Sequence, residues 1–242
     1  MRYSRVLLKL SGEALSGDEE KPIFPYDPET LLRIAKEITQ VSNLGVEIAI
    51  VMGGGNIFRG ANGASKGMDR VAADQFGMLA TIQNGIVLHD LLTRVCGRKE
   101  ARLMSALQAR PVAEPYLPKK ARHHLDLKRV IILAGGTGNP YCTTDYAAAL
   151  RACEIKADIV AKATNTDGLY DKDPRHDKSA VFLQHATYKR CLDEELKVMD
   201  TEAFALCRNE KMPILVFSVK EPGNIVKALT GDEIGSVVSD QR

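Results

Sequence analysis

A glycine turn followed by hydroxyl side chains is the strongest chemical signal in the chain. It covers residues 135–148, with the sequence Gly-Gly-Thr-Gly-Asn-Pro-Tyr-Cys-Thr-Thr-Asp-Tyr-Ala-Ala. Its glycines allow a sharp turn and a close approach of the backbone to a ligand. Thr143, Thr144 and Asp145 stand directly before a helix-forming run, where such side chains cap free N–H groups that also attract anions. We interpret the stretch as a site for a phosphorylated ligand. A tight strand-to-helix turn with an ordinary cap is the alternative.

A second glycine-rich segment, 53–60, has the sequence Gly-Gly-Gly-Asn-Ile-Phe-Arg-Gly. Successive glycines pack no side chains and lose much backbone entropy on folding, so we expect them to bring main-chain N–H groups onto phosphate oxygens. Arg59 adds a fork of donors that suits phosphate. A plain flexible loop is the alternative. The common fingerprints G-x-x-x-x-G-K-[ST] and G-x-G-x-x-G do not occur in the chain.

Two lysines stand at the carboxyl ends of apolar runs that read as core strands. Lys9 ends the run 3–10, and Lys162 ends the run 158–162. Ligands of open α/β sheets bind at the carboxyl ends of strands, so both cations are candidates to hold an anion. For Lys9, a solvated lysine at a strand end is the alternative. The polar run 163–174 follows, where Tyr170 could hold a base while nearby carboxylates lie close to a metal.

A carboxylate falls on the apolar face of a long helical pattern over 69–96. The predicted stripe consists of Val71, Met78, Leu79, Ile82 and Ile86, and Asp74 shares it. A carboxylate on a core face is rarely left unpaired. It either meets an arginine for structural reasons or faces a cavity, where it accepts hydrogen bonds from ligand hydroxyls. We expect the cavity.

The elements that must position these residues alternate between strands and helices. Strands are predicted near 3–10, 46–52, 102–107, 130–134, 158–162, 180–183, 214–217 and 236–238, and helices near 28–44, 69–96, 112–124, 145–154, 188–195, 200–209 and 224–229. His123 and His124 are expected to be solvated at a helix end. Such alternation predicts an α/β fold with a mostly parallel central sheet and helices on both faces, a three-layer sandwich. We expect a single domain over 1–242, with an acceptor-binding part at about 1–150 and a nucleotide-binding part at about 151–242.

The composition excludes several classes of function. The 242 residues carry a net charge of +2, which indicates no need for nucleic acid and no anionic membrane partner. No apolar run approaches the roughly 20 residues that span a bilayer, and we expect no secretory leader. The five cysteines form no C-x-x-C pair, so we expect neither a zinc site nor a disulfide framework and place the chain in a reducing cytoplasm.

Taken together, the motifs resemble the bacterial uridylate (UMP) kinases of the amino-acid kinase superfamily. The resemblance rests on Lys9-Leu10-Ser11-Gly12, the segment 53–60, Thr137-Gly138-Asn139-Pro140-x-x-Thr143-Thr144-Asp145, Asp167-Gly168-x-Tyr170-x-x-Asp173-Pro174 and the segment 196–200. It implies ATP-dependent, reversible phosphorylation of UMP to UDP in pyrimidine nucleotide biosynthesis. It also implies a cytoplasmic homohexamer, Mg²⁺ carried with ATP, inhibition by UTP and, in many members, activation by GTP.

The resemblance assigns substrate contacts residue by residue. For ATP it implies Lys9, Leu10, Ser11, Gly12, Gly55, Arg59, Thr164, Asn165, Tyr170 and Asp173. For UMP it implies Gly54, Asp74, Thr137, Gly138, Asn139, Pro140, Tyr141, Cys142, Thr143 and Thr144. The nucleophile would be an anionic phosphate oxygen of UMP, so catalysis can rest on positioning and charge neutralisation without a strong base. We expect Lys9, Lys162 and Arg59 to neutralise charge and Asp145 to orient the lysines.

Three departures from the family pattern bear on regulation and on the acceptor. The segment 17–27 is longer and richer in proline than the usual glycine-rich loop associated with GTP control, so GTP activation is in doubt for this chain. The segment 95–100 also looks lengthened. Cys142 stands where many members have phenylalanine. Two other functions remain as alternatives: a kinase of another small acceptor on the same fold, and a uridine-nucleotide sensor that acts through regulatory partners.

Overall fold

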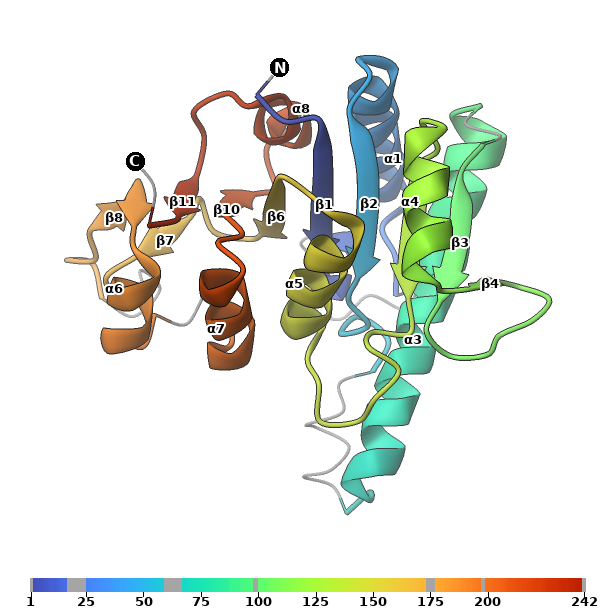
Figure 1. Ribbon diagram of the computed structural model, residues 1–242, viewed down its shortest axis with the longest axis horizontal. Helices are drawn as coiled ribbons and strands as arrows, with labels where there is room; N and C mark the ends of the chain where they lie inside the picture. The colour runs from blue at the N-terminus through green and yellow to red at the C-terminus, as the bar shows by residue number, and fades with distance from the viewer. Residues whose placement is uncertain are drawn as a thin grey trace.

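A nine-stranded sheet runs through the described part of the chain. The computed structural model describes residues 2–16, 25–58, 67–97, 100–172, 177–196 and 199–240. The strand order in the sheet is β4-β3-β5-β2-β1-β6-β10-β11-β9, and a separate two-stranded hairpin consists of β7 and β8 (Figure 1). Arg59, Asp173, Lys197, Val198 and the segment 17–24 lie outside the described residues.

All neighbouring strands of the sheet are parallel except β10 and β11, which are antiparallel. The bounds are β1 Arg5–Leu10, β2 Glu47–Met52, β3 Arg102–Ser105, β4 Glu114–Pro115, β5 Ile131–Ala134, β6 Ile159–Thr164, β9 His185–Ala186, β10 Ile214–Ser218 and β11 Ser236–Val238, with β7 Leu169–Tyr170 and β8 Phe182–Leu183 in the hairpin. Because helices cover both faces, the central strands are continuous apolar runs with hardly any exposed residue.

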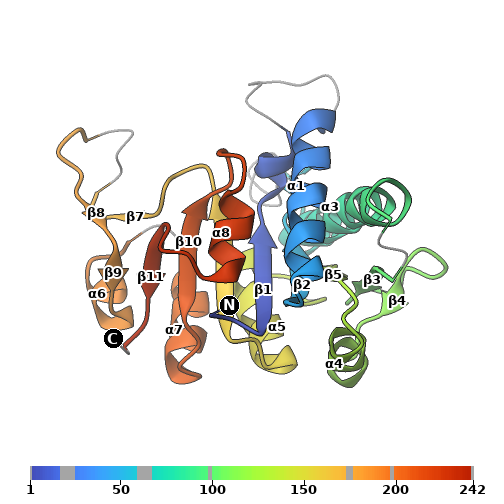
Figure 2. The ribbon, with the colours of Figure 1, turned by 90° about the horizontal axis from the view of Figure 1, so that it is seen from above.

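Helices cover both faces of this sheet, as Figure 2 shows from above. One face is covered by α1 Pro28–Asn43, α3 Arg70–Asp90 and α8 Asn224–Thr230, and the other by α4 Pro118–Asp126, α5 Thr144–Ile155, α6 Tyr188–Asp193 and α7 Thr201–Asn209. A 3₁₀ turn, η1 Gly12–Leu15, follows β1, and a π-helix, η2 Leu91–Val95, continues α3. The predicted α/β class with a mostly parallel sheet is therefore confirmed.

Two helices begin at side-chain caps beside the carboxyl ends of the central strands. Thr143 Oγ1 accepts a hydrogen bond from the Tyr146 N–H at 3.0 Å and starts α5. Asp200 Oδ1 accepts one from the Ala203 N–H at 2.7 Å and starts α7. Such caps satisfy N–H groups that have no partner inside the helix, so each fixes the point where its helix begins.

Several predicted elements are wrong in detail. The helix predicted over 112–124 begins only at Pro118, because Pro115 and Pro118 disfavour helical backbone in the residues before them and Pro118 suits a first helical position. The run 163–174, predicted as a loop, contains β7, and β9 was not predicted. His124, predicted to be solvated, is buried beside Glu114 and Arg129, while His123 is exposed.

The helix predicted over 69–96 forms, but its buried stripe differs from the prediction. Met78 and Ile82 are buried, whereas Leu79 and Ile86 are 48% and 41% exposed. The buried face instead includes small or polar residues, among them Ala73, Thr81, Asn84 and Gly85. Within the described ranges, none of the helices has the length and apolar character needed to cross a membrane.

Candidate functional site

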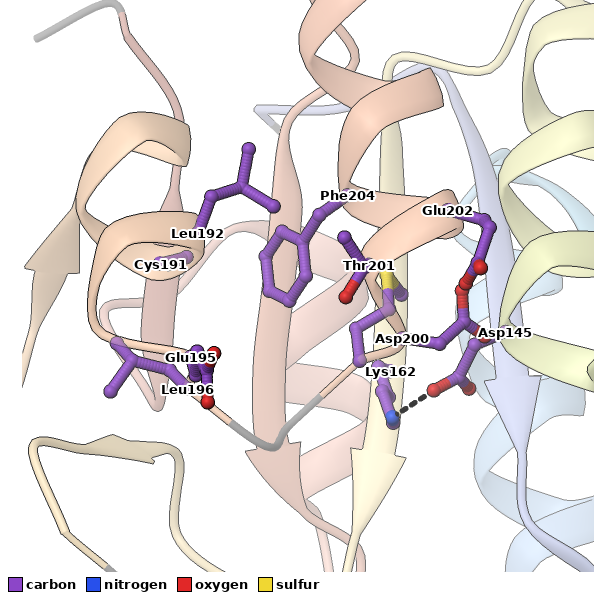
Figure 3. Close-up of a pocket in the computed structure, with 11 residues that line it drawn as sticks. Asp145, Lys162, Cys191, Leu192, Glu195, Leu196, Asp200, Thr201, Glu202 and Phe204 are labelled. Atoms are coloured by element: carbon purple, nitrogen blue, oxygen red, sulfur yellow. Dashed lines mark hydrogen bonds and ion pairs between the residues drawn. The ribbon is translucent and has the colours of Figure 1, made fainter.

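Two lysines and one aspartate meet at the carboxyl ends of β1 and β6. The parallel register makes Lys9 the Cα partner of Lys162, so their side chains leave adjacent strands on the same face. Asp145, in the first turn of α5, lies between them. Lys9 Nζ is 3.0 Å from Asp145 Oδ1. Lys162 Nζ is 2.5 Å from Asp145 Oδ2, and Figure 3 shows this second contact. Two cations and one anion leave a net positive charge for an anionic ligand.

Both ammonium groups are nearly removed from solvent. Lys9 is 7% and Lys162 8% exposed, so the alternative of a solvated lysine at position 9 is wrong. Burial lowers the pKa of Lys162, although the charge of Asp145 opposes this shift. Burial would raise the pKa of Asp145, but the charges of Lys9 and Lys162 outweigh it and hold that pKa below its ordinary value. Asp145 is therefore ionised at neutral pH.

A cavity of about 690 Å³ opens beside this cluster. Asp145 and Lys162 lie at one end of it, and the start of α7 contributes Asp200, Thr201 and Glu202. Figure 3 shows mostly apolar side chains on the other side, from α6 and α7 and the segment between them; they are Cys191, Leu192, Leu196 and Phe204, with Glu195 beside Leu196. Met199 also lines the cavity. Among the described residues, the lining also includes four carboxylates beside the single ammonium group of Lys162. The cavity can therefore hold a planar base and ligand hydroxyl groups, whereas an anionic group would have to lie at Lys9 and Lys162.

The acceptor loop, residues 135–143, runs from β5 to α5 and is held by side chains of other elements. The Gly135 N–H donates to Thr81 Oγ1 at 2.7 Å, and the Tyr141 N–H donates to Asp74 Oδ2 at 2.8 Å. Thr143 Oγ1 donates a short hydrogen bond to Asp200 Oδ2. The middle of the loop stays open, because Asn139, Tyr141 and Cys142 are exposed. An open loop on a fixed frame can contact a ligand through its backbone.

Asp74 meets an arginine and also touches this loop. Arg70 Nε is 2.8 Å from Asp74 Oδ2, the same oxygen that accepts the Tyr141 N–H. The Arg70 guanidinium lies 5.3 Å from the centroid of the Tyr141 ring. Asp74 thus has the arginine partner that was the alternative to the expected cavity, and its binding of a ligand hydroxyl stays a prediction. The arginine pair occupies Oδ2, so a ligand hydroxyl would have to approach Oδ1 or displace the loop amide.

The described part of the glycine-rich segment 53–60, which follows β2, contacts its neighbours closely. A Cβ on Gly54 would lie 2.8 Å from the Gly77 carbonyl oxygen, and a Cβ on Gly12 would lie 2.6 Å from the Gly55 nitrogen. These glycines therefore have a packing reason that the sequence alone did not reveal. Gly55 lies half-buried at the start of the following turn.

A pair of amide side chains fixes the same loop. Asn84, fully buried on α3, donates to the Gly53 carbonyl at 2.6 Å and to Asn56 Oδ1 at 2.8 Å. Asn56 Nδ2 donates in return to Asn84 Oδ1 at 3.1 Å. The sequence reasoning missed Asn84 and Thr81. The available signal was two hydrogen-bonding residues three positions apart inside an otherwise apolar helix.

The remaining described residues that were predicted to bind ATP or UMP lie outside the cluster of Lys9, Asp145 and Lys162. Ser11 follows Leu10 and caps η1 by accepting from the Ala14 N–H at 3.2 Å. Thr164 ends β6, and its Oγ1 donates a hydrogen bond to the Thr166 carbonyl at 2.8 Å. These residues and Asn165 and Tyr170 are not among those that line the cavity; Tyr170 instead contacts Phe182 in the hairpin, with ring centroids 5.4 Å apart. The remaining residues predicted to bind the acceptor lie half-buried: Thr137, Gly138 and Pro140 in the acceptor loop, and Thr144 at the start of α5.

The carboxylates of the site suit a metal that arrives with its own oxygen ligands. Among the residues the structure describes, no group of three or more His, Cys, Asp or Glu side chains could hold a metal ion. Asp145 Oδ1 is buried and lacks an aligned hydrogen bond, although Lys9 lies within ion-pair distance. Mg²⁺ is commonly bound by one or two carboxylates together with substrate phosphates. The site fits such an ion and provides no complete protein cage.

Comparisons with known proteins agree with this geometry. Residues 4–218 match the model of the amino acid kinase family. The structure is similar to UMP kinase from Bacillus anthracis, at 38% identity with a TM-score of 0.93, covering 99% of this chain and 97% of that one. UMP kinase from Ureaplasma parvum matches at 34% identity, a TM-score of 0.90, and 99% and 100% coverage. Uridylate kinase from Archaeoglobus fulgidus matches at 28% identity, a TM-score of 0.73, and 97% and 99% coverage.

Proposed function

Because the chain belongs to the amino acid kinase family and, within it, to the UMP kinases, we propose that it transfers the γ-phosphoryl group of ATP to UMP, forming ADP and UDP. The observation that carries this proposal is the buried cluster of Lys9, Asp145 and Lys162 at the carboxyl ends of the central strands β1 and β6. Two ammonium groups held by one carboxylate match the need to neutralise charge on a transferring phosphoryl group.

In the proposed mechanism the protein positions two anionic groups and needs no general base. A phosphate oxygen of UMP attacks the γ-phosphorus of ATP, and the bond to the β,γ-bridging oxygen breaks, so ADP leaves. Lys9 and Lys162 lie where they can stabilise the charge on the transferring group, and Asp145 holds both ammonium groups in place. Mg²⁺ enters with ATP and shields its phosphate charges. Arg59 is a further proposed phosphate ligand.

The two substrates are proposed to approach the cluster from opposite sides. UMP would contact the acceptor loop, Gly54 and Asp74, which the structure brings close together through the bond from Tyr141 to Asp74. ATP would place its phosphates near Lys9 and Gly55, with its nucleoside toward the cavity beside α7. The family resemblance proposes Thr164, Asn165, Tyr170 and Asp173 for that nucleoside; Thr164, Asn165 and Tyr170 do not line this cavity, so these contacts are an alternative placement of the nucleoside. The acceptor part is thus assigned to about 1–150 and the ATP part to about 151–242.

Replacement of Lys9 by methionine tests the assignment of the cluster. Lys9→Met keeps the length of the side chain but removes one of the two cations, so kcat should fall by about 10²–10³. Asp145 keeps its bond to Lys162, so folding should survive. Lys128→Met is the control, because this lysine pairs with Glu47 at the amino end of β2, away from the cluster. A folded Lys9→Met enzyme with a near-wild-type kcat would contradict the proposed role of Lys9 in phosphoryl transfer.

The assembly and regulation of the protein are also proposed from the family. The face of α3 that bears Phe76, Leu79 and Ile86 exposes large apolar side chains, which supports burial of this face in a homo-oligomer, a homohexamer by the family pattern. UTP is proposed as an inhibitor, and GTP as an activator only if the altered segment 17–27 still permits it. Five free cysteines are consistent with a reducing, cytoplasmic setting. The place in pyrimidine nucleotide biosynthesis is proposed from the family alone.

A further inference from the structure

Arg151 is a buried arginine on α5 whose contacts converge on the beginning of the acceptor loop. It is 6% exposed. Its Nη2 donates to the Gly136 carbonyl at 3.1 Å, and its Nη1 donates to Glu154 Oε2 at 2.7 Å. The guanidinium also lies 4.0 Å from the centroid of the Tyr116 ring. Arginine is rarely buried to this degree unless it is paired, so these contacts hold the side chain in one orientation.

Tyr116 and Glu154 complete a closed set of contacts around this arginine. The Tyr116 hydroxyl donates to Glu154 Oε2 at 2.6 Å, the same oxygen that accepts from Arg151. Burial and the neighbouring Glu154 raise the pKa of Tyr116 above its ordinary value, so the hydroxyl keeps its proton at neutral pH. The planar fork of Arg151 is therefore fixed by a ring on one face and a carboxylate at its edge.

The turn that Arg151 contacts is rich in glycine and is closed by one backbone hydrogen bond, from the Gly138 N–H to the Gly135 carbonyl at 2.9 Å. Gly135, Gly136 and Gly138 all adopt positive φ angles, of 75°, 58° and 85°. The three glycines offer no side chains for packing, and the Thr137 side chain between them bonds Asn139 within the loop, so contacts from other elements must fix where the turn lies. The Gly135 N–H is fixed by Thr81 on α3, and the Gly136 carbonyl is fixed by Arg151 on α5. The turn is thus held from two helices on opposite faces of the sheet.

We propose that Arg151 is a positioning residue for the acceptor loop, with Tyr116 and Glu154 as the groups that orient it. By fixing the Gly136 carbonyl, it sets the place from which residues 137–142 meet the acceptor nucleotide. Displacement of a binding group by about 1 Å can cost orders of magnitude in rate. The inference rests on the proposed function, because that function assigns UMP to this loop.

Arg5, the first residue of β1, provides a matched control because it contacts the same helix, α5. Its Nη1 donates to the carbonyl of Ile155, the last residue of α5, at 2.7 Å, and its other nitrogens contact Glu47 and Asp126. Both arginines therefore fasten a backbone carbonyl and a carboxylate. Arg5 acts at the end of α5 that lies away from the acceptor loop, so a general loss of stability would affect both variants alike.

The test compares Arg151→Lys with Arg5→Lys, because one ammonium cannot reproduce the two-pronged contact of Arg151. We expect Arg151→Lys to raise the KM for UMP by about tenfold or more while the KM for ATP changes by less than about twofold. Without nucleotide, amide hydrogen exchange of the peptide over 135–143 should be faster by about tenfold. Arg5→Lys should change neither quantity. Tyr116→Phe keeps the ring and the Gly136 bond, so its KM for UMP should rise by less than about threefold.

The two readouts separate the inference from the function on which it rests. Two results can occur together: amide exchange of the loop is faster in Arg151→Lys, and the wild-type protein fails to phosphorylate UMP. That combination would reject the proposed function and keep the anchoring role of Arg151. Unchanged exchange and unchanged KM for UMP would overturn the inference, as would a parallel rise of both KM values. If Arg151→Lys does not fold, Glu154→Gln decides: a KM for UMP raised by about threefold or more supports the role, and an unchanged KM overturns it.

Discussion

At the scale of single residues, the proposed mechanism requires the Lys162 ammonium group to stay protonated although its side chain is buried. Its burial opposes the charge, and Asp145 only partly compensates, so the pKa lies below the ordinary lysine value of 10.5. The unfolded chain then binds more protons than the folded protein at pH values between these two pKa values. The burial of Lys162 therefore costs stability at neutral pH, and this cost disappears as the pH rises through that window.

Activity should respond to alkaline pH in the opposite direction from this stability contribution. Loss of the Lys162 proton removes a cation from the proposed phosphoryl site, so kcat should fall through an apparent pKa below 10.5. Lys162→Arg carries a guanidinium that does not titrate in this range, so its alkaline decline should be displaced to higher pH or absent, whatever its absolute rate. The measurement is kcat against pH with folding monitored by circular dichroism. Identical declines in both proteins would contradict the role of Lys162.

Cys142 offers a residue-scale test of where the acceptor binds. The thiol is exposed in the acceptor loop, whereas Cys191 and Cys207 are buried, and burial raises their pKa values to about 11 and about 12. Labelling by a small maleimide should therefore reach Cys142 and spare those two thiols in the native protein. Saturating UMP should protect Cys142, and ATP alone should not. Mass spectrometry of each cysteine measures this, and equal labelling with and without UMP would remove the support for this placement.

At the scale of elements, α3 is the helix that holds both loops for which we propose substrate contacts. Its Asn84 fixes the loop after β2, its Thr81 fixes Gly135, and its Asp74 reaches the Tyr141 amide. This explains why its buried face contains polar and small residues where an apolar stripe was predicted. Helical periodicity counts apolar side chains, so it cannot recognise a face whose purpose is to bind backbone groups.

The contact between α3 and the loop after β2 predicts a steric effect at Gly54. A methyl group there would lie 2.8 Å from the Gly77 carbonyl oxygen and 3.0 Å from Ala80 Cβ. Gly54→Ala should therefore destabilise the protein by about 1–3 kcal/mol, as overpacking typically does, and should lower kcat/KM for UMP by about tenfold or more. Gly45→Ala, at a φ of 95° that strains alanine, should also lower stability; with no atom within 4 Å of the new methyl group, it should leave kcat/KM unchanged. Equal effects on kcat/KM would show that the close contact does not position the loop.

At the scale of the whole molecule, the sequence predicts the class of fold but not the order of its strands. Alternating apolar runs and helical patterns suffice for a parallel sheet with two covered faces. Nothing in them reveals that β1 lies between β2 and β6, or that Lys9 and Lys162 share a register position. Pairing of strands far apart in the chain is decided by the packing of all layers together, which no local pattern contains.

The same limit explains which parts of the site could be predicted. Lys9, Lys162 and Asp145 were found because each stands at a strand or helix end, where chemistry is expected in α/β folds. Arg151 and Asp200 were not found, because an arginine inside a helix and an aspartate at a helix start have common structural explanations. Their meaning depends on Gly136 and Thr143, which come close only in the folded chain.

The central claim is that the cluster of Lys9, Asp145 and Lys162 transfers a phosphoryl group from ATP to UMP. The most direct measurement incubates the protein with ATP, Mg²⁺ and UMP, CMP or carbamate, and identifies the products by ³¹P NMR, with Lys162→Met as the control. We predict UDP and ADP in equal amounts from UMP, little product from CMP or carbamate, and a rate lowered by about 10²–10³ in the variant. Efficient phosphorylation of CMP or carbamate in place of UMP, or an unchanged rate in a folded Lys162→Met protein, would contradict the account.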